Sequence, residues 1–266
     1  MGASTSGMLQ QTRAMHALVA LVNRHFLELP DEGFVAWARS GAHRGVLAAL
    51  AEAGAEPPRG ARAGDGAEGA ALEEVVADGE SDVAEAAGAD DDAALDAQAR
   101  LLVEGTRLML AFVDAHDADG VDALMQTLGV DRTRLYRGVT PGYSPPYPAE
   151  GVWLGQDDRR AARLFEELTV LYRENGVQMA HDANERPDYI GVQLEFVRHM
   201  LSRQIEALER GDEDAASACA EAVASFAEKH LAWLPAFIEK ARPMAETDFY
   251  RGHLMMLEGV RRELLG

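Results

Sequence analysis

The chain has 266 residues, with 25 Lys and Arg against 45 Asp and Glu, which gives a formal net charge of −20. A surface of this sign repels nucleic-acid phosphates and anionic lipid, so neither is expected as a partner, whereas cationic polypeptide segments are attracted. Cys219 is the only cysteine, which excludes an intrachain disulfide and a cysteine-based metal site and favours a reducing compartment. No secretory signal pattern and no run of 18 apolar residues occurs, so a cytoplasmic protein is expected.

The N-terminal region predicts two helices. Apolar residues recur three or four positions apart from Thr12 to Leu29, as on one face of an amphipathic helix, and Pro30 closes this segment. A second helix is expected from Asp31 to Ala53, with a break near Gly41.

Residues 54–98 differ from the rest of the chain in composition. They are rich in Ala, Gly, Asp and Glu, and their 13 acidic residues against two arginines give a net charge of −11. Because few large aliphatic residues are available for burial, we expect a solvated, weakly helical or disordered acidic insertion.

Helical spacing returns from Leu101 to Leu128, with an interruption near 119–120 that predicts two helices. Residues 131–151 contain four prolines and three glycines, which exclude a continuous helix and predict a long loop.

The C-terminal half predicts four more helical segments. They are expected at 157–175 with Gly176 as its cap, from Pro187 to Leu208, from Asp212 to a break at Pro235, and from Phe249 to Leu265. Because no segment alternates with a period of two, a sheet is not expected. The fold class is therefore all-α: one helical-bundle domain over residues 1–266, with 54–98 as the insertion.

Catalytic and cofactor motifs are missing from the sequence. It contains no nucleophile elbow, phosphate-binding loop, dinucleotide fingerprint or paired cysteines, so no enzymatic activity and no cofactor are expected. His181, Asp182 and Glu185 are close enough in sequence to ligate a metal, although no second ligand group is tied to them by motif spacing. A small metal-dependent helical enzyme therefore stays open as an alternative.

Two segments point to polypeptide binding. The loop from Pro141 to Trp153 concentrates tyrosines, prolines and a tryptophan that a loop cannot bury completely, which favours a peptide-contact patch. The segment Glu185–Tyr189 places carboxylates at the start of a helix, where Asp188 either stabilises the helix dipole or contacts a ligand. A scaffold or adaptor that binds a folded partner through the loop alone is a second alternative.

Three further sequence patterns occur in a fixed order along the chain. They are Leu135-Tyr136 followed by Gly138 and by Pro145-Pro146-Tyr147 with Glu150, then residues 185–196, ERPDYIGVQLEF, and then residues 226–237, FAEKHLAWLPAF. In this order they resemble the TorD/DmsD family of redox-enzyme maturation chaperones, which is related to the NarJ group. The first is similar to the family's Leu-Phe pair and its Pro-rich Tyr-Glu segment, the second to the Glu-x-Pro-Asp-His stretch that opens a family helix, and the third to a late family helix with His-Leu, Trp and Pro.

Three positions depart from the family pattern. Tyr189 stands where the family usually has His, Gln193 where it usually has Glu, and Arg132 where an aromatic residue often precedes the Leu-Phe pair. The Asp-His pair is tied in the family to signal-peptide binding, so these departures concern the details of recognition. A tyrosine can still stack and donate a hydrogen bond.

The resemblance implies a TorD-like all-helical chaperone that holds the twin-arginine signal peptide and the catalytic subunit of a molybdopterin oxidoreductase until cofactor insertion is complete. Domain-swapped homodimers occur in the family. The arginines of such a peptide require carboxylates as hydrogen-bonding partners, and its apolar part requires a hydrophobic groove. The expected peptide-binding residues are Leu135, Tyr136, Pro145, Pro146, Tyr147, Glu150, Trp153, Glu185, Pro187, Asp188 and Tyr189.

Overall fold

The computed structural model describes residues 5–41, 43–45, 47, 82–138, 142–155, 157–177 and 186–265, with side chains described from residue 99 onward in the segment that starts at 82. These parts are mostly helical, and an isolated β-bridge pairs Ala149 with Tyr189. The expectation of an all-α fold is confirmed. In the described part of the chain, no helix is long and apolar enough to cross a bilayer.

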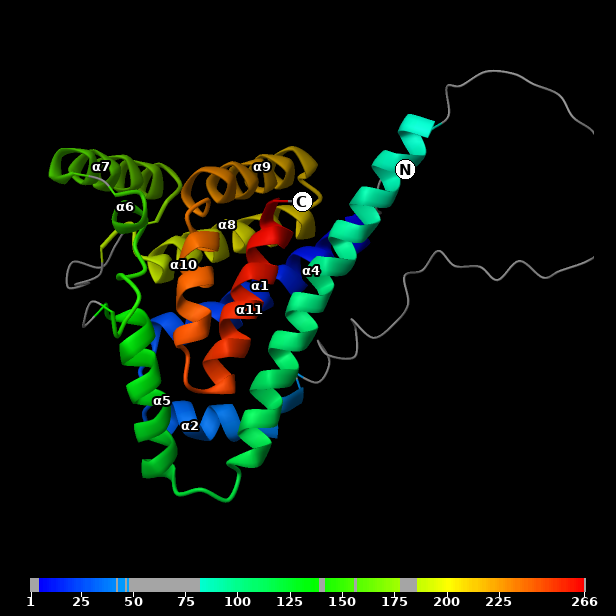
Figure 1. The fold of residues 1–266 in the computed structure, drawn as a ribbon. Helices are drawn as coiled ribbons and strands as arrows, with labels where there is room; N and C mark the ends of the chain where they lie inside the picture. Colours follow the sequence, from blue (N-terminus) through cyan, green and yellow to red (C-terminus); the bar gives the residue numbers. More distant parts are fainter. Residues whose placement is uncertain are drawn as a thin grey trace, which may run out of the picture.

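The helices follow the chain as α1 Thr5–Leu27, α2 Glu32–Arg39, α4 Asp82–Ala115, α5 Val121–Tyr136, α6 Glu150–Trp153, α7 Asp158–Glu174, α8 Ile190–Glu209, α9 Glu213–His230, α10 Leu234–Ala241, the 3-10 turn η1 Arg242–Met244, and α11 Asp248–Leu265. The most extensive packing joins α11 to α4, α1 to α8, and α8 to α9. In Figure 1, α4 and α5 flank the central helices α10 and α11, α2 crosses beneath them, and α7 and α9 lie at the other end.

The contact between α4 and α11 depends on two glycines that face each other. A Cβ added to Gly105 would lie 2.6 Å from the backbone oxygen of Gly252 and 2.9 Å from Met256 Cγ. The absence of side chains at both positions therefore allows the two backbones to approach closely. Met256 and Leu257 next to this crossing are buried and join the main core.

Local signals explain several helix ends. Asp31, Asp157 and Asp212 each accept a hydrogen bond from the backbone N–H three residues later, at 2.8, 2.9 and 3.1 Å, as N-cap residues do. Gly176 after α7 and Gly211 after α8 have φ values of +81° and +70°, which glycine adopts without strain. The expected ends of these two helices are confirmed.

Residues 82–98 of the expected acidic insertion form the first half of α4, which the helical alternative for that segment allows, and 54–81 lie outside the described residues. Three other sequence expectations need correction. Helix α1 begins at Thr5 and ends at Leu27, so Leu29, assigned to its buried face, is 61% exposed. The expected loop at 131–151 starts too early, because α5 continues to Tyr136. Helix α8 begins at Ile190 and not at Pro187.

The errors at the start of the expected loop and at the start of α8 have physical reasons. Residues 131–136 contain no Pro or Gly, and buried hydrogen bonds from Arg132 and to Asp131 hold that last turn of α5 in the core. Helix α8 starts late because the backbone at Asp188 and Ile190 is paired with the preceding Pro-rich loop.

Candidate functional site

The Pro-rich loop and the start of α8 are joined by backbone pairing. Glu150 N–H donates to the Asp188 carbonyl at 3.0 Å, and Ile190 N–H donates to the Pro148 carbonyl at 3.1 Å, on either side of the bridge between Ala149 and Tyr189. These bonds fix the loop against the helix. Two motifs separated by about forty positions in the sequence are therefore side by side.

Tyr147 and Tyr189 form the aromatic contact between these two segments. Their rings stack with centroids 5.3 Å apart and an interplanar angle of 21°. Tyr189 is almost fully buried, and its hydroxyl donates to the Phe26 carbonyl at the end of α1 at 2.9 Å, whereas Tyr147 is half-buried. Tyr189 therefore stacks on another ring and donates a hydrogen bond, which are the two interactions expected of a tyrosine at this position.

Asp188 is fully buried and already has partners. Arg186 donates to both carboxylate oxygens, each at 2.9 Å, and Gly151 N–H donates to Oδ2 at 2.9 Å. The Arg186 guanidinium also lies 4.9 Å from the centre of the Phe165 ring on α7. The carboxylate expected to meet a ligand arginine is therefore paired with an arginine of the same chain.

A buried polar network connects all three motifs. Gln193 donates to Glu150 at 2.7 Å, and His230 Nδ1 lies 3.1 Å from the same carboxylate. Trp233 Nε1 donates to the His230 carbonyl at 2.9 Å and contacts the Gln193 amide oxygen at 3.3 Å. All four residues are buried. Gln at 193 suits this network, because a carboxylate there would repel Glu150 at hydrogen-bonding distance.

Several expected site residues are buried in the core. Leu135 and Tyr136 are fully buried, and the Tyr136 hydroxyl hydrogen-bonds to His253 Nδ1 at 2.6 Å. Burial raises the pKa of Tyr136 well above its usual value. Pro145 is buried as well, so in this structure these residues support the site and are not its surface.

The accessible part of the site is a smaller aromatic and proline-rich surface. Pro146 is exposed, whereas Tyr147, Trp153 and Pro187 are half-buried. Trp153 Nε1 donates to the Tyr147 carbonyl at 3.2 Å, so the one-turn helix α6 is fixed to the loop. Val152 and Leu154 are 38% and 53% exposed, and sequence reasoning missed both, although apolar residues beside a Pro-rich loop were a usable signal. We refer to Pro146, Tyr147, Val152, Trp153, Leu154 and Pro187 as the Tyr147 surface.

Arg132 explains the third departure from the family pattern. It is 1% exposed, and it donates to the His25 and Phe26 carbonyls at 3.1 and 2.5 Å. These carbonyls belong to the last turn of α1, where no further helical N–H is available. An arginine at this position therefore caps α1 from α5.

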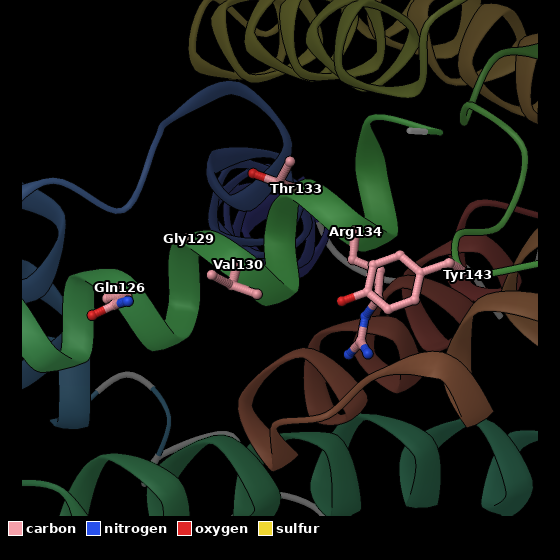
Figure 2. Close-up of a pocket in the computed structure, with 6 residues that line it drawn as sticks. All are labelled: Gln126, Gly129, Val130, Thr133, Arg134 and Tyr143. Carbon is pink, nitrogen blue, oxygen red and sulfur yellow. The ribbon is translucent and has the colours of Figure 1, made fainter. Parts of the chain in front are cut away.

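A separate pocket of about 460 Å³ lies along α5, and sequence reasoning did not identify it (Figure 2). It is lined by Gln126, Gly129, Val130, Thr133, Arg134 and Tyr143. The centre of the Tyr143 ring is 5.5 Å from the Arg134 guanidinium carbon, and Figure 2 shows the two side chains next to each other. A neighbouring pocket of about 560 Å³ shares Gln126 and Val130 with it and reaches Glu246 and Asp248.

The candidate metal ligands cannot be placed. His181, Asp182 and Glu185 lie outside the described residues. Glu185 was also expected to bind the peptide, so that contact lies outside the described residues as well. Within the described ranges, no group of three or more His, Cys, Asp or Glu side chains is arranged to hold a metal ion. Cys219 is buried in the main core, as expected for a small apolar side chain.

Comparison with known proteins supports one family. The family model described as nitrate reductase delta subunit matches residues 88–239, more than half of the chain and the region that holds all three motifs. The chaperone protein TorD of Vibrio vulnificus strain YJ016 is 28% identical over 149 residues, which cover 55% of this chain and 67% of the relative. TorD of strain CMCP6 is 27% identical over the same shares, and TorD of Photobacterium profundum is 25% identical over 131 residues, 49% of this chain and 58% of the relative. No solved structure gives a significant match.

These matches agree with the motif order, and they favour a chaperone over the metal-dependent enzyme as the description of this chain. The family is one of non-enzymatic chaperones. The chain belongs to the nitrate reductase delta subunit family and is a redox-enzyme maturation chaperone of the TorD type.

Proposed function

We propose that this chaperone acts in the cytoplasm, where it binds the twin-arginine signal peptide and the apoprotein of a molybdopterin-containing oxidoreductase before cofactor insertion and export. The observation that carries the proposal is the backbone pairing at Ala149 and Tyr189, which stacks the half-buried Tyr147 on Tyr189, the residue that follows Asp188. An aromatic surface beside a carboxylate matches the two chemical parts of such a leader, its arginines and its apolar stretch.

The rigidity of the Tyr147 surface favours binding of an extended peptide. Prolines at 145, 146 and 148 restrict the loop, and the hydrogen bond from Trp153 to the Tyr147 carbonyl fixes α6 against it. A surface that is ordered before binding loses little conformational entropy when the ligand arrives. Aromatic side chains supply a large apolar contact area at the same time.

The charge of the chain supports the same ligand class. A net charge of −20 raises the local concentration of a cationic n-region and speeds its association with the chaperone. Part of this attraction acts between exposed charges, so raising the salt concentration from about 0.05 to 0.5 M should weaken the complex.

The proposal is tested by titrating the purified chain with a twin-arginine leader peptide and with the same peptide carrying two glutamines instead. We expect the glutamine peptide to bind at least about tenfold more weakly, because charge-assisted hydrogen bonds contribute roughly 1.5–3 kcal/mol. Tyr147→Ala should also weaken the leader complex by roughly tenfold, through loss of aromatic contact area.

Two controls separate the binding surface from general effects. Tyr147→Phe keeps the ring and should keep the affinity, and Val121→Ala removes a 40% exposed side chain at the start of α5 and should have no effect. Equal affinity for the arginine and glutamine peptides would reject the proposal. It would favour an adaptor that recognises a partner through the Pro-rich loop alone.

A further inference from the structure

The two side chains of the Arg186–Asp188 ion pair differ in their exposure to solvent. The Asp188 side chain is 0% exposed, whereas the Arg186 side chain is 36% exposed. Solvent therefore reaches the arginine but not the carboxylate to which it is bound. Any external group that pairs with Asp188 must first take the place of Arg186.

The surroundings of Arg186 supply what a guanidinium group requires. Two carboxylate oxygens accept two parallel hydrogen bonds, which is the fork geometry that arginine prefers. The Phe165 ring lies 4.9 Å from the guanidinium carbon and adds a cation–π contact. Gly151 N–H donates to the same carboxylate, so the acceptor stays oriented when its partner is exchanged.

We propose that Asp188, oriented by the Gly151 amide, and Phe165 form a guanidinium-binding subsite that the free chain fills with its own Arg186. A ligand arginine enters this subsite by displacing Arg186. That the ligand arginine belongs to a signal peptide rests on the proposed function, whereas the existence of the subsite does not.

Occupation of the subsite by Arg186 selects against ligands that offer only a single arginine. Arg186 is only two residues from Asp188, so its effective concentration at the carboxylate is high and a single foreign arginine competes poorly. The apparent affinity of any ligand is reduced by the small fraction of chains in which Arg186 has moved away. A peptide that also binds the neighbouring Tyr147 surface gains the additional free energy needed to displace it.

The subsite itself is tested with ethylguanidinium, which reproduces the end of an arginine side chain. In Arg186→Ala, millimolar ethylguanidinium should raise the melting temperature and bind in calorimetry, whereas ethylammonium, a cation without the planar fork, should bind markedly more weakly. The parent chain and the double variant Arg186→Ala/Asp188→Asn should not respond. If Arg186→Ala responds no more than the parent, the subsite does not exist.

Arg186→Gln is the second variant, because its side-chain amide can still donate one hydrogen bond to Asp188. It replaces Arg186→Ala in the ethylguanidinium titration if the alanine variant does not fold. It should also bind the twin-arginine leader at least about fivefold more tightly than the parent does, because the competing guanidinium is gone. Arg198→Gln is the matched control, since Arg198 is 38% exposed, pairs with Glu195 and should leave the affinity unchanged.

The results separate this inference from the proposed function. Suppose that the parent binds the leader and that Arg186→Gln binds it equally well or more weakly. Arg186 is then not displaced by the leader, and the proposed displacement is overturned. If neither chain binds the leader, the proposed function fails, and the ethylguanidinium titration alone decides whether the subsite exists.

Discussion

Asp131→Ala is expected to lower the free energy of unfolding by about 3–5 kcal/mol, the range found when one partner of a buried ion pair is removed. Asp131 is 1% exposed, and its carboxylate accepts hydrogen bonds from the Arg134 side chain at 2.7 Å and from Thr247 N–H at 2.8 Å. Glu246 N–H and the Thr247 hydroxyl donate to it as well, at 3.1 and 2.7 Å. Alanine would leave a buried guanidinium without its buried carboxylate partner and two backbone donors without an acceptor.

Asp117→Ala is the matched control for this prediction. Asp117 also pairs with an arginine, Arg44, at 2.8 Å, but its side chain is 60% exposed. Surface pairs contribute roughly 0–1 kcal/mol, so this variant should remain close to the parent. Urea unfolding followed by far-UV circular dichroism measures both variants. A loss in Asp131→Ala no larger than that in Asp117→Ala would show that the carboxylate does not hold α5 to the start of α11.

The second large effect is a loss of stability as the pH falls from about 7 to about 4. Burial lowers the pKa of His253 from its usual 6.5 to about 4, and burial together with the neighbouring His253 lowers the pKa of His25 well below its usual value. In the unfolded chain both side chains bind protons below about pH 6.5. The unfolded state therefore takes up more protons than the folded state in this pH range, and acid favours unfolding.

His253 alone should contribute about 2 kcal/mol of this loss at about pH 5, given a folded-state pKa of about 4. Its two ring nitrogens contact the Tyr136 hydroxyl at 2.6 Å and the Val22 carbonyl at 2.9 Å, which suits a neutral ring that accepts at Nδ1 and donates at Nε2. Urea unfolding at about pH 7.5 and about pH 5 measures the effect.

His253→Gln provides the comparison for the pH effect. It retains a donor and an acceptor without a titrating group, so its stability should depend less steeply on pH than that of the parent. Equal stability of the parent at both pH values, or an unchanged pH dependence in His253→Gln, would contradict a neutral buried His253.

Local sequence signals predicted most of the fold because they act within a few residues. The caps at Asp157 and Asp212 and the glycines at 176 and 211 give helix ends that need no knowledge of distant contacts. The boundaries at 131–136 and 187–190 could not be predicted in this way. They depend on bonds to Thr247, His25 and Pro148, which are distant in sequence.

The adjacency of the two segments was predicted from the sequence, but the pairing of their side chains was not. Motif order brought Tyr147 and Asp188 into one hypothesis, and their segments are adjacent in the structure. Sequence spacing could not show that Arg186 already binds Asp188, or that Glu150, Gln193 and His230 are buried together. Such pairings depend on side-chain direction and on which groups are excluded from water, and hydrophobic periodicity carries neither.

The most direct test of the central claim is to locate the bound leader by photo-crosslinking. A twin-arginine peptide with a photoreactive aromatic residue in its apolar stretch is irradiated with the chain, and the labelled fragments are identified by mass spectrometry. We expect labelling within residues 143–154 and 186–189, with loss of that labelling when the peptide arginines are replaced by glutamine. A separate pocket is lined by residues of α1, α8, α9 and α11, among them Met8, Met15 and Val223. Labelling confined to that pocket would contradict the claim that the leader binds at the Tyr147 surface.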